Sequence, residues 1–112
     1  MREIIFKAKT AYDNEWICGS LVVDEWKPQH LSTHFITKRN KKTSVSARTV
    51  CQFIGSYSID NEMIYEWDKV LFNEEEFTIV FFDGKFILAK NGKPYIYNPK
   101  FELCKVIGNI HD

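Results

Sequence analysis

Two turn dipeptides constrain the fold of this 112-residue chain more than any other feature. Asp83-Gly84 and Asn91-Gly92 lie in the stretch FTIVFFDGKFILAKNGKPYIYN, between apolar and aromatic runs. Asp-Gly and Asn-Gly accept the positive φ angles of a type I′ turn, whose twist matches that of paired antiparallel strands. Pro94 lacks an N–H, so the strand that contains it belongs at a sheet edge. The stretch therefore predicts a three-stranded meander, with strands near residues 76–82, 85–90 and 93–98.

Short apolar runs elsewhere in the chain predict further strands. REIIFKAK and EWICGSLVVDE, joined by the turn TAYDN, indicate a first hairpin, in which Gly19 marks a bulge or a close approach of two backbones. THFITK indicates another strand and KRNKKTS an exposed loop, while MIYEWDKVLF and LCKVIGNI complete a set of seven or eight strands. ARTVCQF indicates one short helix capped by the Ser46 hydroxyl, although the β-branched Thr49 and Val50 equally allow a strand.

This pattern predicts a mainly β protein, with a small barrel-like antiparallel sheet, one short helix and an SH3-like C-terminal half as one option. A chain of 13.2 kDa suffices for a single domain over residues 1–112. The alternative is two lobes, at about 1–55 and 56–112, that share one core. Apolar residues make up 45% of the chain and charged residues 27%, which lets it bury enough surface to fold.

The charge and the cysteine content of the chain limit the partners and the cellular compartment that we expect. Fifteen basic and fifteen acidic residues cancel, so no global field draws the protein to nucleic acid or to a membrane. The N-terminus lacks the apolar core of a signal peptide, and no apolar stretch approaches the roughly 18 residues of a membrane span, which predicts a cytosolic protein. Cys18, Cys51 and Cys104 lack metal or redox spacing and have apolar neighbours, so we expect reduced, structural thiols.

Four stretches resemble a known family, in the same order along the chain. MREIIFKAK with NEWICGSL is similar to the M-R-E-I-K-F-R start and the G-x-W-V-Y-G-x-L hairpin of the YopX-like proteins of phages and prophages. TVCQFIG resembles the family's T-V-G-Q-F-T-G, IYEWDKV resembles I-Y-E-G-D-I-V, and VIGNIHD resembles V-I-G-N-I-Y-E. The resemblance spans the chain from end to end. It implies a mainly β, cytosolic protein of mobile genetic elements, with no agreed activity and no catalytic residues to carry over.

The chain departs from the family's pattern at two glycines and one turn. Cys51 and Trp67 stand where the family usually has glycine, and the family's D-x-N-G turn is shortened to SIDNEM. If the glycine at the Trp67 position needs positive φ, tryptophan there costs about 1 to 2 kcal/mol. The resemblance implies a structural signature, to which we assign Gly55, Tyr65, Glu66, Asp68, Gly84, Gly92 and Gly108.

The carboxylates of GSYSIDNEMIYEWDKVLF raise the question of acid/base catalysis. Such chemistry needs two carboxylates about 5 to 10 Å apart, in a pocket that raises the pKa of one of them. Glu66 and Asp68 would share one face of a strand, which permits this chemistry without demanding it. We expect instead that Asp68 accepts backbone N–H groups at a strand corner, with Gly55 freeing the backbone and Asp60-Asn61 making the turn.

No metal, cofactor or catalytic residue is predicted. His30 and His34 are four residues apart, but Pro28 and the β-branched run after it indicate an extended segment, in which the two lie about 13 Å apart, too far to share a zinc ion. Three cysteines and three histidines allow many accidental pairings, which do not indicate a nucleophile and its base. The chain has no nucleophile elbow, P-loop or dinucleotide fingerprint.

Two binding functions remain. The pair Phe81-Phe82 and the stretch YIYN place large apolar groups on both strand faces. This pattern favours a non-enzymatic protein-interaction or self-assembling module. Small β-barrels also bind single-stranded nucleic acid by stacking bases on aromatic side chains beside basic loops. We expect a protein partner or homo-oligomer first, nucleic acid as the alternative and hydrolase activity third, with no small-molecule substrate or membrane partner. The nucleic-acid alternative rests on the one basic run, Lys38, Arg39, Lys41 and Lys42.

Overall fold

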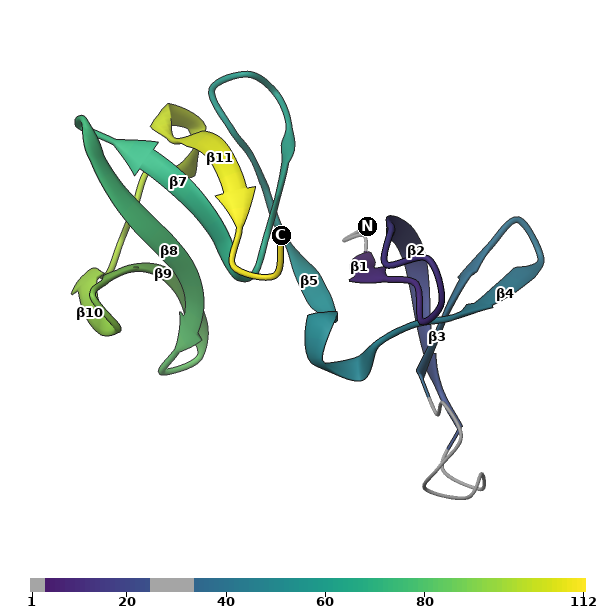
Figure 1. Ribbon diagram of the computed structural model, residues 1–112. Helices are drawn as coiled ribbons and strands as arrows, with labels where there is room; N and C mark the ends of the chain where they lie inside the picture. The colour runs from purple at the N-terminus through teal and green to yellow at the C-terminus, as the bar shows by residue number, and fades with distance from the viewer. Residues whose placement is uncertain (1–3, 25–33) are drawn as a thin grey trace. The chain divides into compact units, whose positions relative to one another are not determined.

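The computed structural model of the protein describes residues 4–24 and 34–112. These residues form short antiparallel strands and two single turns of 3₁₀ helix (Figure 1). The mainly β prediction is therefore confirmed, whereas the predicted short helix is reduced to one of these single turns, Ala47–Thr49. The chain divides into two compact units, Met1–Gln52 and Phe53–Asp112, and the division falls close to the boundary of the two-lobe alternative.

The first unit is an antiparallel sheet in the order β4-β3-β2-β1-β5. The predicted first hairpin is present, because β1 pairs with β2 with Lys7 opposite Cys18. The last strand begins in this unit, where Cys51 and Gln52 pair with β1, and continues into the second. The strand bounds are β1 (Phe6–Lys9), β2 (Trp16–Val23), β3 (His34–Lys38), β4 (Lys41–Ser44) and β5 (Cys51–Tyr57).

Gly19 lies where β2 passes close to β3. A Cβ atom built on Gly19 would stand 2.3 Å from the backbone oxygen of Thr37 and 3.1 Å from Cγ2 of Ile36. Glycine is needed here because any side chain would force the two strands apart. The same sheet buries a small core of Ala8, Ile36 and Val45, with further apolar side chains packed against it: Phe6, Ile17, Leu21 and Val50.

The polar run predicted as a loop is a second hairpin. Strands β3 and β4 pair through Lys38 and Lys41, and Arg39 and Asn40 make the turn with φ angles of 50° and 66°. These two positive φ angles are those of a type I′ turn. The loop prediction was wrong because it rested on the polar character of the run. Asparagine adopts positive φ readily, and the strand pairing on both sides holds Arg39 there.

Ser46 does not cap a helix as predicted. The single 3₁₀ turn η1 (Ala47–Thr49) follows it, and its hydroxyl makes no capping hydrogen bond. The turn is held by the buried Thr49 instead, whose hydroxyl donates to the Ser46 carbonyl at 2.7 Å and accepts the Lys9 N–H at 2.9 Å. A strand begins at Cys51, so strand propensity prevailed over a longer helix.

The second unit contains a five-stranded antiparallel sheet in the order β10-β9-β8-β7-β11, while β6 pairs with β5. The predicted meander is β8 to β10. Both of its turns have positive φ at both central residues, and the strand that contains Pro94 is an edge of the sheet. The bounds are β6 (Met63–Tyr65), β7 (Asp68–Phe72), β8 (Glu75–Phe82), β9 (Lys85–Lys90), β10 (Lys93–Ile96), η2 (Phe101–Leu103) and β11 (Lys105–Asn109).

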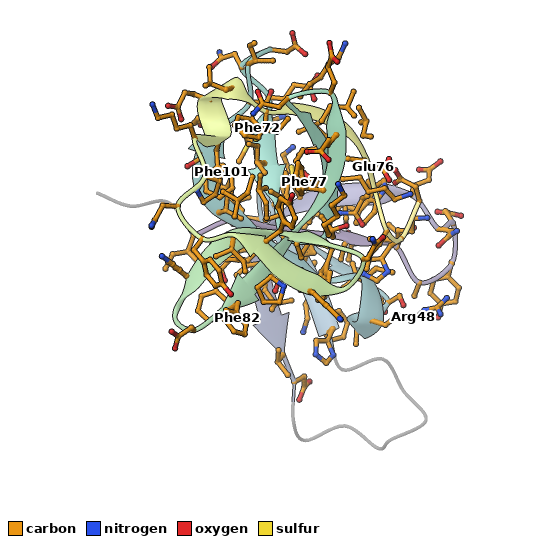
Figure 2. The ribbon with its side chains drawn as sticks, turned by 90° about the vertical axis from the view of Figure 1, so that its left-hand side faces the viewer. Arg48, Phe72, Glu76, Phe77, Phe82 and Phe101 are labelled. Atoms are coloured by element: carbon orange, nitrogen blue, oxygen red, sulfur yellow. The ribbon has the colours of Figure 1, made fainter. Side chains whose placement is uncertain are left out.

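Within this sheet, the strand that comes last in the sequence, β11, pairs with the strand that comes first, β7. Val106 of β11 lies opposite Val70 of β7. Strands β10 and β11 are the two edges, so barrel closure is not among the described pairings, and the barrel-like and SH3-like predictions stay predictions. Phe72 and Phe101 pack against the core on the side of β8 that carries Phe77 (Figure 2). The buried core is Ile54, Ile64, Val70, Phe77, Ile79, Leu88 and Cys104.

Candidate functional site

Asp68 is a buried structural carboxylate at the corner between β6 and β7. It is 1% exposed. Its Oδ2 accepts the Tyr65 N–H at 2.8 Å, and its Oδ1 accepts a side-chain N–H of Asn109 at 2.9 Å. Charge-assisted hydrogen bonds of this kind fix a turn strongly, and they occupy both oxygens that a catalytic carboxylate would present to a substrate.

The other carboxylates of this stretch do not converge on Asp68. Asp60 and Glu62 are exposed, and their backbone N–H groups bind the Ser58 hydroxyl at 3.2 Å each. The prediction that Glu66 and Asp68 share a strand face is wrong, because Glu66 and Trp67 form the turn between β6 and β7. The hydrogen bonds of Asp68 and Ser58 make this stretch a structural corner.

Trp67 occupies the position where the resemblance suggested a glycine. Its φ of 70° is positive, so the strain expected from a tryptophan at this position, about 1 to 2 kcal/mol, is present. Hydrogen bonds hold the backbone on both sides: the Trp67 N–H donates to the Ile79 carbonyl at 2.8 Å, and the Ile110 N–H donates to the Trp67 carbonyl at 3.0 Å. This conformation directs the side chain into a pocket.

We call this pocket the apolar pocket. It has a volume of about 560 Å³ and lies over the face of β8 that carries Val80 and Phe82. Phe82 is 42% exposed, and its ring centroid lies 6.2 Å from that of Tyr97. Figure 2 shows Phe82 apart from the core residue Phe77, as the strand alternation requires. The lining residues are Trp67, Thr78, Val80, Phe82, Ala89, Gly92, Pro94 and Ile110.

Aromatic side chains are exposed on the opposite face of the meander as well. Phe81 is 55% exposed and makes an edge contact with Phe86 at 5.1 Å between ring centroids. Tyr95 is also 55% exposed and lies 5.5 Å from the buried Phe77. Large apolar groups thus occur on both faces of these strands, as the sequence pattern predicts.

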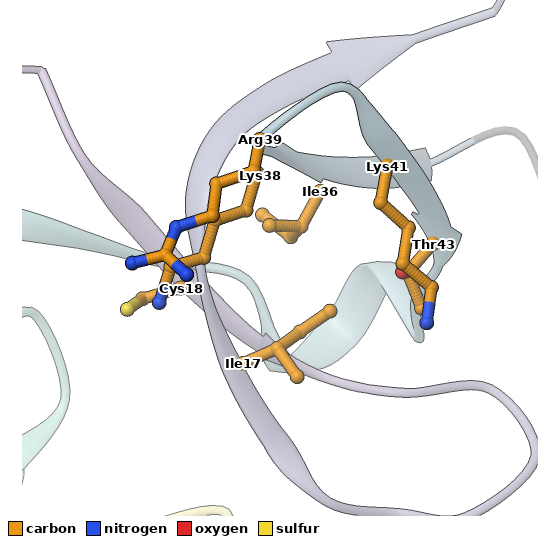
Figure 3. A pocket seen from close by; sticks show the side chains of 7 residues that line it. All are labelled: Ile17, Cys18, Ile36, Lys38, Arg39, Lys41 and Thr43. Carbon is orange, nitrogen blue, oxygen red and sulfur yellow. The ribbon is translucent and has the colours of Figure 1, made fainter.

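A second pocket lies in the first unit, and we call it the basic pocket. It has a volume of about 460 Å³. Figure 3 shows Lys38 and Arg39 on one side of it and Lys41 with Thr43 on the other, with Ile36 between them. The hairpin register explains this arrangement, because directly opposite residues share a face and β3 and β4 pair these side chains across the hairpin. The lining residues are Ile17, Cys18, Ile36, Lys38, Arg39, Lys41 and Thr43.

The predicted nucleic-acid residues are therefore split between two faces. Lys38, Arg39 and Lys41 line the basic pocket. Lys42 alternates to the other face of β4, where its ammonium nitrogen lies 4.2 Å from the ring centroid of Phe35. A cation over an aromatic ring is attracted by the ring's quadrupole, and among the described residues no such ring contact is found for the three pocket cations.

The three pocket cations have no carboxylate partner within residues 4–24 and 34–112. The charge is also distributed unevenly along the chain. Residues 1–52 contain nine basic and five acidic side chains, whereas residues 53–112 contain six basic and ten acidic. The net charge of zero for the whole chain conceals this asymmetry, which becomes visible when the charged residues of each half are counted separately.

The three cysteines are described, and none of them forms a disulfide within residues 4–24 and 34–112. Cys51 and Cys104 are fully buried. Burial, with a smaller contribution from the Glu102 carboxylate, raises the pKa of Cys104 to about 11, so its thiol stays protonated at pH 7. His30 lies outside the described residues, and His34 begins β3. Within residues 4–24 and 34–112, no group of three or more metal-ligating side chains occurs.

Comparison with known proteins leaves the family open. The sequence matches no known protein family and no curated protein. The YopX-like resemblance therefore stays a prediction. Among the described residues, no helix has the length and apolar character needed to cross a membrane.

Proposed function

We propose that this protein is a non-enzymatic interaction module that associates with a second copy of itself through the apolar pocket. The observation that carries the proposal is the pocket's composition, because its lining side chains are apolar except for the Thr78 hydroxyl and the indole N–H of Trp67. Half-exposed Phe82 and Ile110 form part of its wall. Covering such side chains removes apolar surface from water, which is the main favourable term in protein association.

The pocket reaches an open sheet edge, which supports docking of another polypeptide. Gly92 and Pro94 line the pocket and belong to the turn and strand at this edge. Strand β10 pairs only with β9 among the described strands, so its outer backbone groups can pair with a strand from another chain. Strand addition next to an apolar pocket combines backbone hydrogen bonds with side-chain recognition.

Charge favours a second copy as the occupant. The excess of positive charge in residues 1–52 and of negative charge in residues 53–112 makes these two parts of neighbouring copies attract each other. A net charge of zero also removes the long-range repulsion between copies. The resemblance to YopX-like proteins supports a role for this assembly as a phage or prophage accessory protein in the bacterial cytosol.

The test is the mass of the protein in solution, measured by light scattering at increasing concentration. We expect a concentration-dependent rise toward a multimer, and we expect Phe82→Ser to weaken association about tenfold or more, as loss of an interface anchor does. Phe81→Ser is the matched control, because Phe81 is the adjacent residue on the opposite strand face. A wild-type protein that stays monomeric at millimolar concentration would contradict the proposal, as would equal weakening by both substitutions.

A further inference from the structure

We infer that the basic pocket binds the phosphate and the base of one nucleotide, either free or within a single strand. Lys38, Arg39 and Lys41 would contact the phosphate, and the base would cover the half-buried Ile17. This inference goes beyond self-association and does not depend on it, because it concerns residues 1–52 rather than the apolar pocket.

The three cations place like charges close together in the hairpin. Lys38 and Lys41 lie directly opposite each other at the end of the hairpin, and Arg39 lies in the turn between them. Like charges directly opposite on a pair of strands are destabilising. No described carboxylate compensates them, so an anion bound between them would relieve their repulsion. Arg39 adds a planar guanidinium, whose geometry matches two phosphate oxygens at once.

The apolar surface of the basic pocket favours one kind of anion over another. Ile17 and Ile36 line the same pocket as the cations; Ile36 is buried, and the half-buried Ile17 is the one of the two that meets water. A bare inorganic anion would leave this part of Ile17 in contact with water, whereas a nucleotide carries a flat ring that covers it. The volume of about 460 Å³ lies within the usual range for small-molecule sites, about 300 to 1,000 Å³. The Thr43 hydroxyl supplies a further hydrogen-bonding group beside Lys41.

The hairpin also holds the cations in place. The β3–β4 ladder pairs Ile36 with Thr43 and Lys38 with Lys41, which fixes the distance between the two sides of the pocket. A positive φ at both turn residues, Arg39 and Asn40, keeps the connection short. Cations on a tight hairpin lose less conformational freedom on binding than cations on a loop, which favours affinity.

The experiment measures binding by calorimetry, with adenosine monophosphate, adenosine and inorganic phosphate as separate probes. We expect the nucleotide to bind more tightly than either of its parts, and we expect its affinity to fall as salt is raised. Lys41→Gln should weaken nucleotide binding about threefold to tenfold, and Arg39→Gln should do the same. Lys42→Gln is the matched control, with the same loss of charge one residue away on the other face, and should change binding less than twofold.

A fluorescently labelled 15-nucleotide oligothymidylate distinguishes the two sources of the nucleotide. If it binds and adenosine monophosphate displaces it, the pocket reads one nucleotide of a strand; if only the free nucleotide binds, the ligand is free. Binding of neither probe at low salt would overturn the inference, and so would equal weakening by Lys41→Gln and Lys42→Gln. Equal affinity for a polyglutamate peptide would overturn it as well. The light-scattering test with Phe82→Ser does not depend on any of these results, so each proposal can be contradicted without the other.

Discussion

Asp68 and Asn109 are 41 residues apart in the sequence and directly opposite each other in β7 and β11. The amide of Asn109 donates to the Asp68 carboxylate at 2.9 Å, and both residues are at most 2% exposed. The Asn109 side-chain oxygen in turn accepts the His111 N–H at 3.0 Å. This pair therefore joins the corner before β7 to the end of the last strand.

Asp68→Ala should lower the free energy of unfolding by about 2 to 4 kcal/mol, because it leaves the Tyr65 N–H and the Asn109 amide buried without this acceptor. Asp68→Asn should lose less, since one amide oxygen still accepts one of the two donors. Urea denaturation measures both values. A loss below about 0.5 kcal/mol in the alanine variant, the size of an ordinary surface substitution, would contradict the structural role.

Trp67→Gly should be more stable than Trp67→Ala, although alanine is usually the less destabilising of the two residues. Both substitutions remove the indole ring, but only glycine adopts the φ of 70° without strain. The strain of about 1 to 2 kcal/mol exceeds the entropic cost of glycine in the unfolded chain, about 0.4 to 1 kcal/mol, so Trp67→Gly should be the more stable variant. Leu71, inside β7, is the control position, where alanine should be the more stable. A more stable Trp67→Ala variant would show that the turn relaxes.

Cys104 should make stability fall in alkaline solution. Its folded-state pKa of about 11 lies above the ordinary thiol pKa of about 8.5, so the unfolded chain releases this proton more readily. The stabilising contribution is present below the unfolded pKa and is lost as pH rises through the folded one. We therefore expect the urea midpoint to fall between about pH 8.5 and 11, and Cys104→Ala to show a smaller fall from its own lower starting value. An equal slope in both proteins would exclude Cys104 as the cause.

Local turn chemistry made part of the fold predictable. Asp83-Gly84 and Asn91-Gly92 form their turns because their φ preferences act within a few residues and agree with the flanking strands. The turns at Arg39-Asn40 and Asn73-Glu74 have the same positive φ angles without glycine. Their sequences carry a weaker local signal, so strand pairing had to impose the conformation, and sequence analysis missed the β3–β4 hairpin.

The candidate sites were less predictable, because they depend on which side chains share a face. The basic run was evident in the sequence, but the separation of Lys41 from Lys42 follows from the register of the hairpin. The structural role of Asp68 was expected from the sequence, whereas its partner Asn109 lies on a strand far along the chain. The apolar pocket combines residues from the β6–β7 turn, the meander and the C-terminal end, which no local pattern brings together.

The sequence by itself determined the mainly β class and the meander with its glycine turns. These features follow from preferences of single residues and from alternation over a few positions, which act at short range. Tertiary structure alone decided the positive φ of Trp67, the partner of Asp68 and the grouping of three cations around one pocket. Each of these depends on pairing between distant segments, whose register is set by the packing of the whole unit.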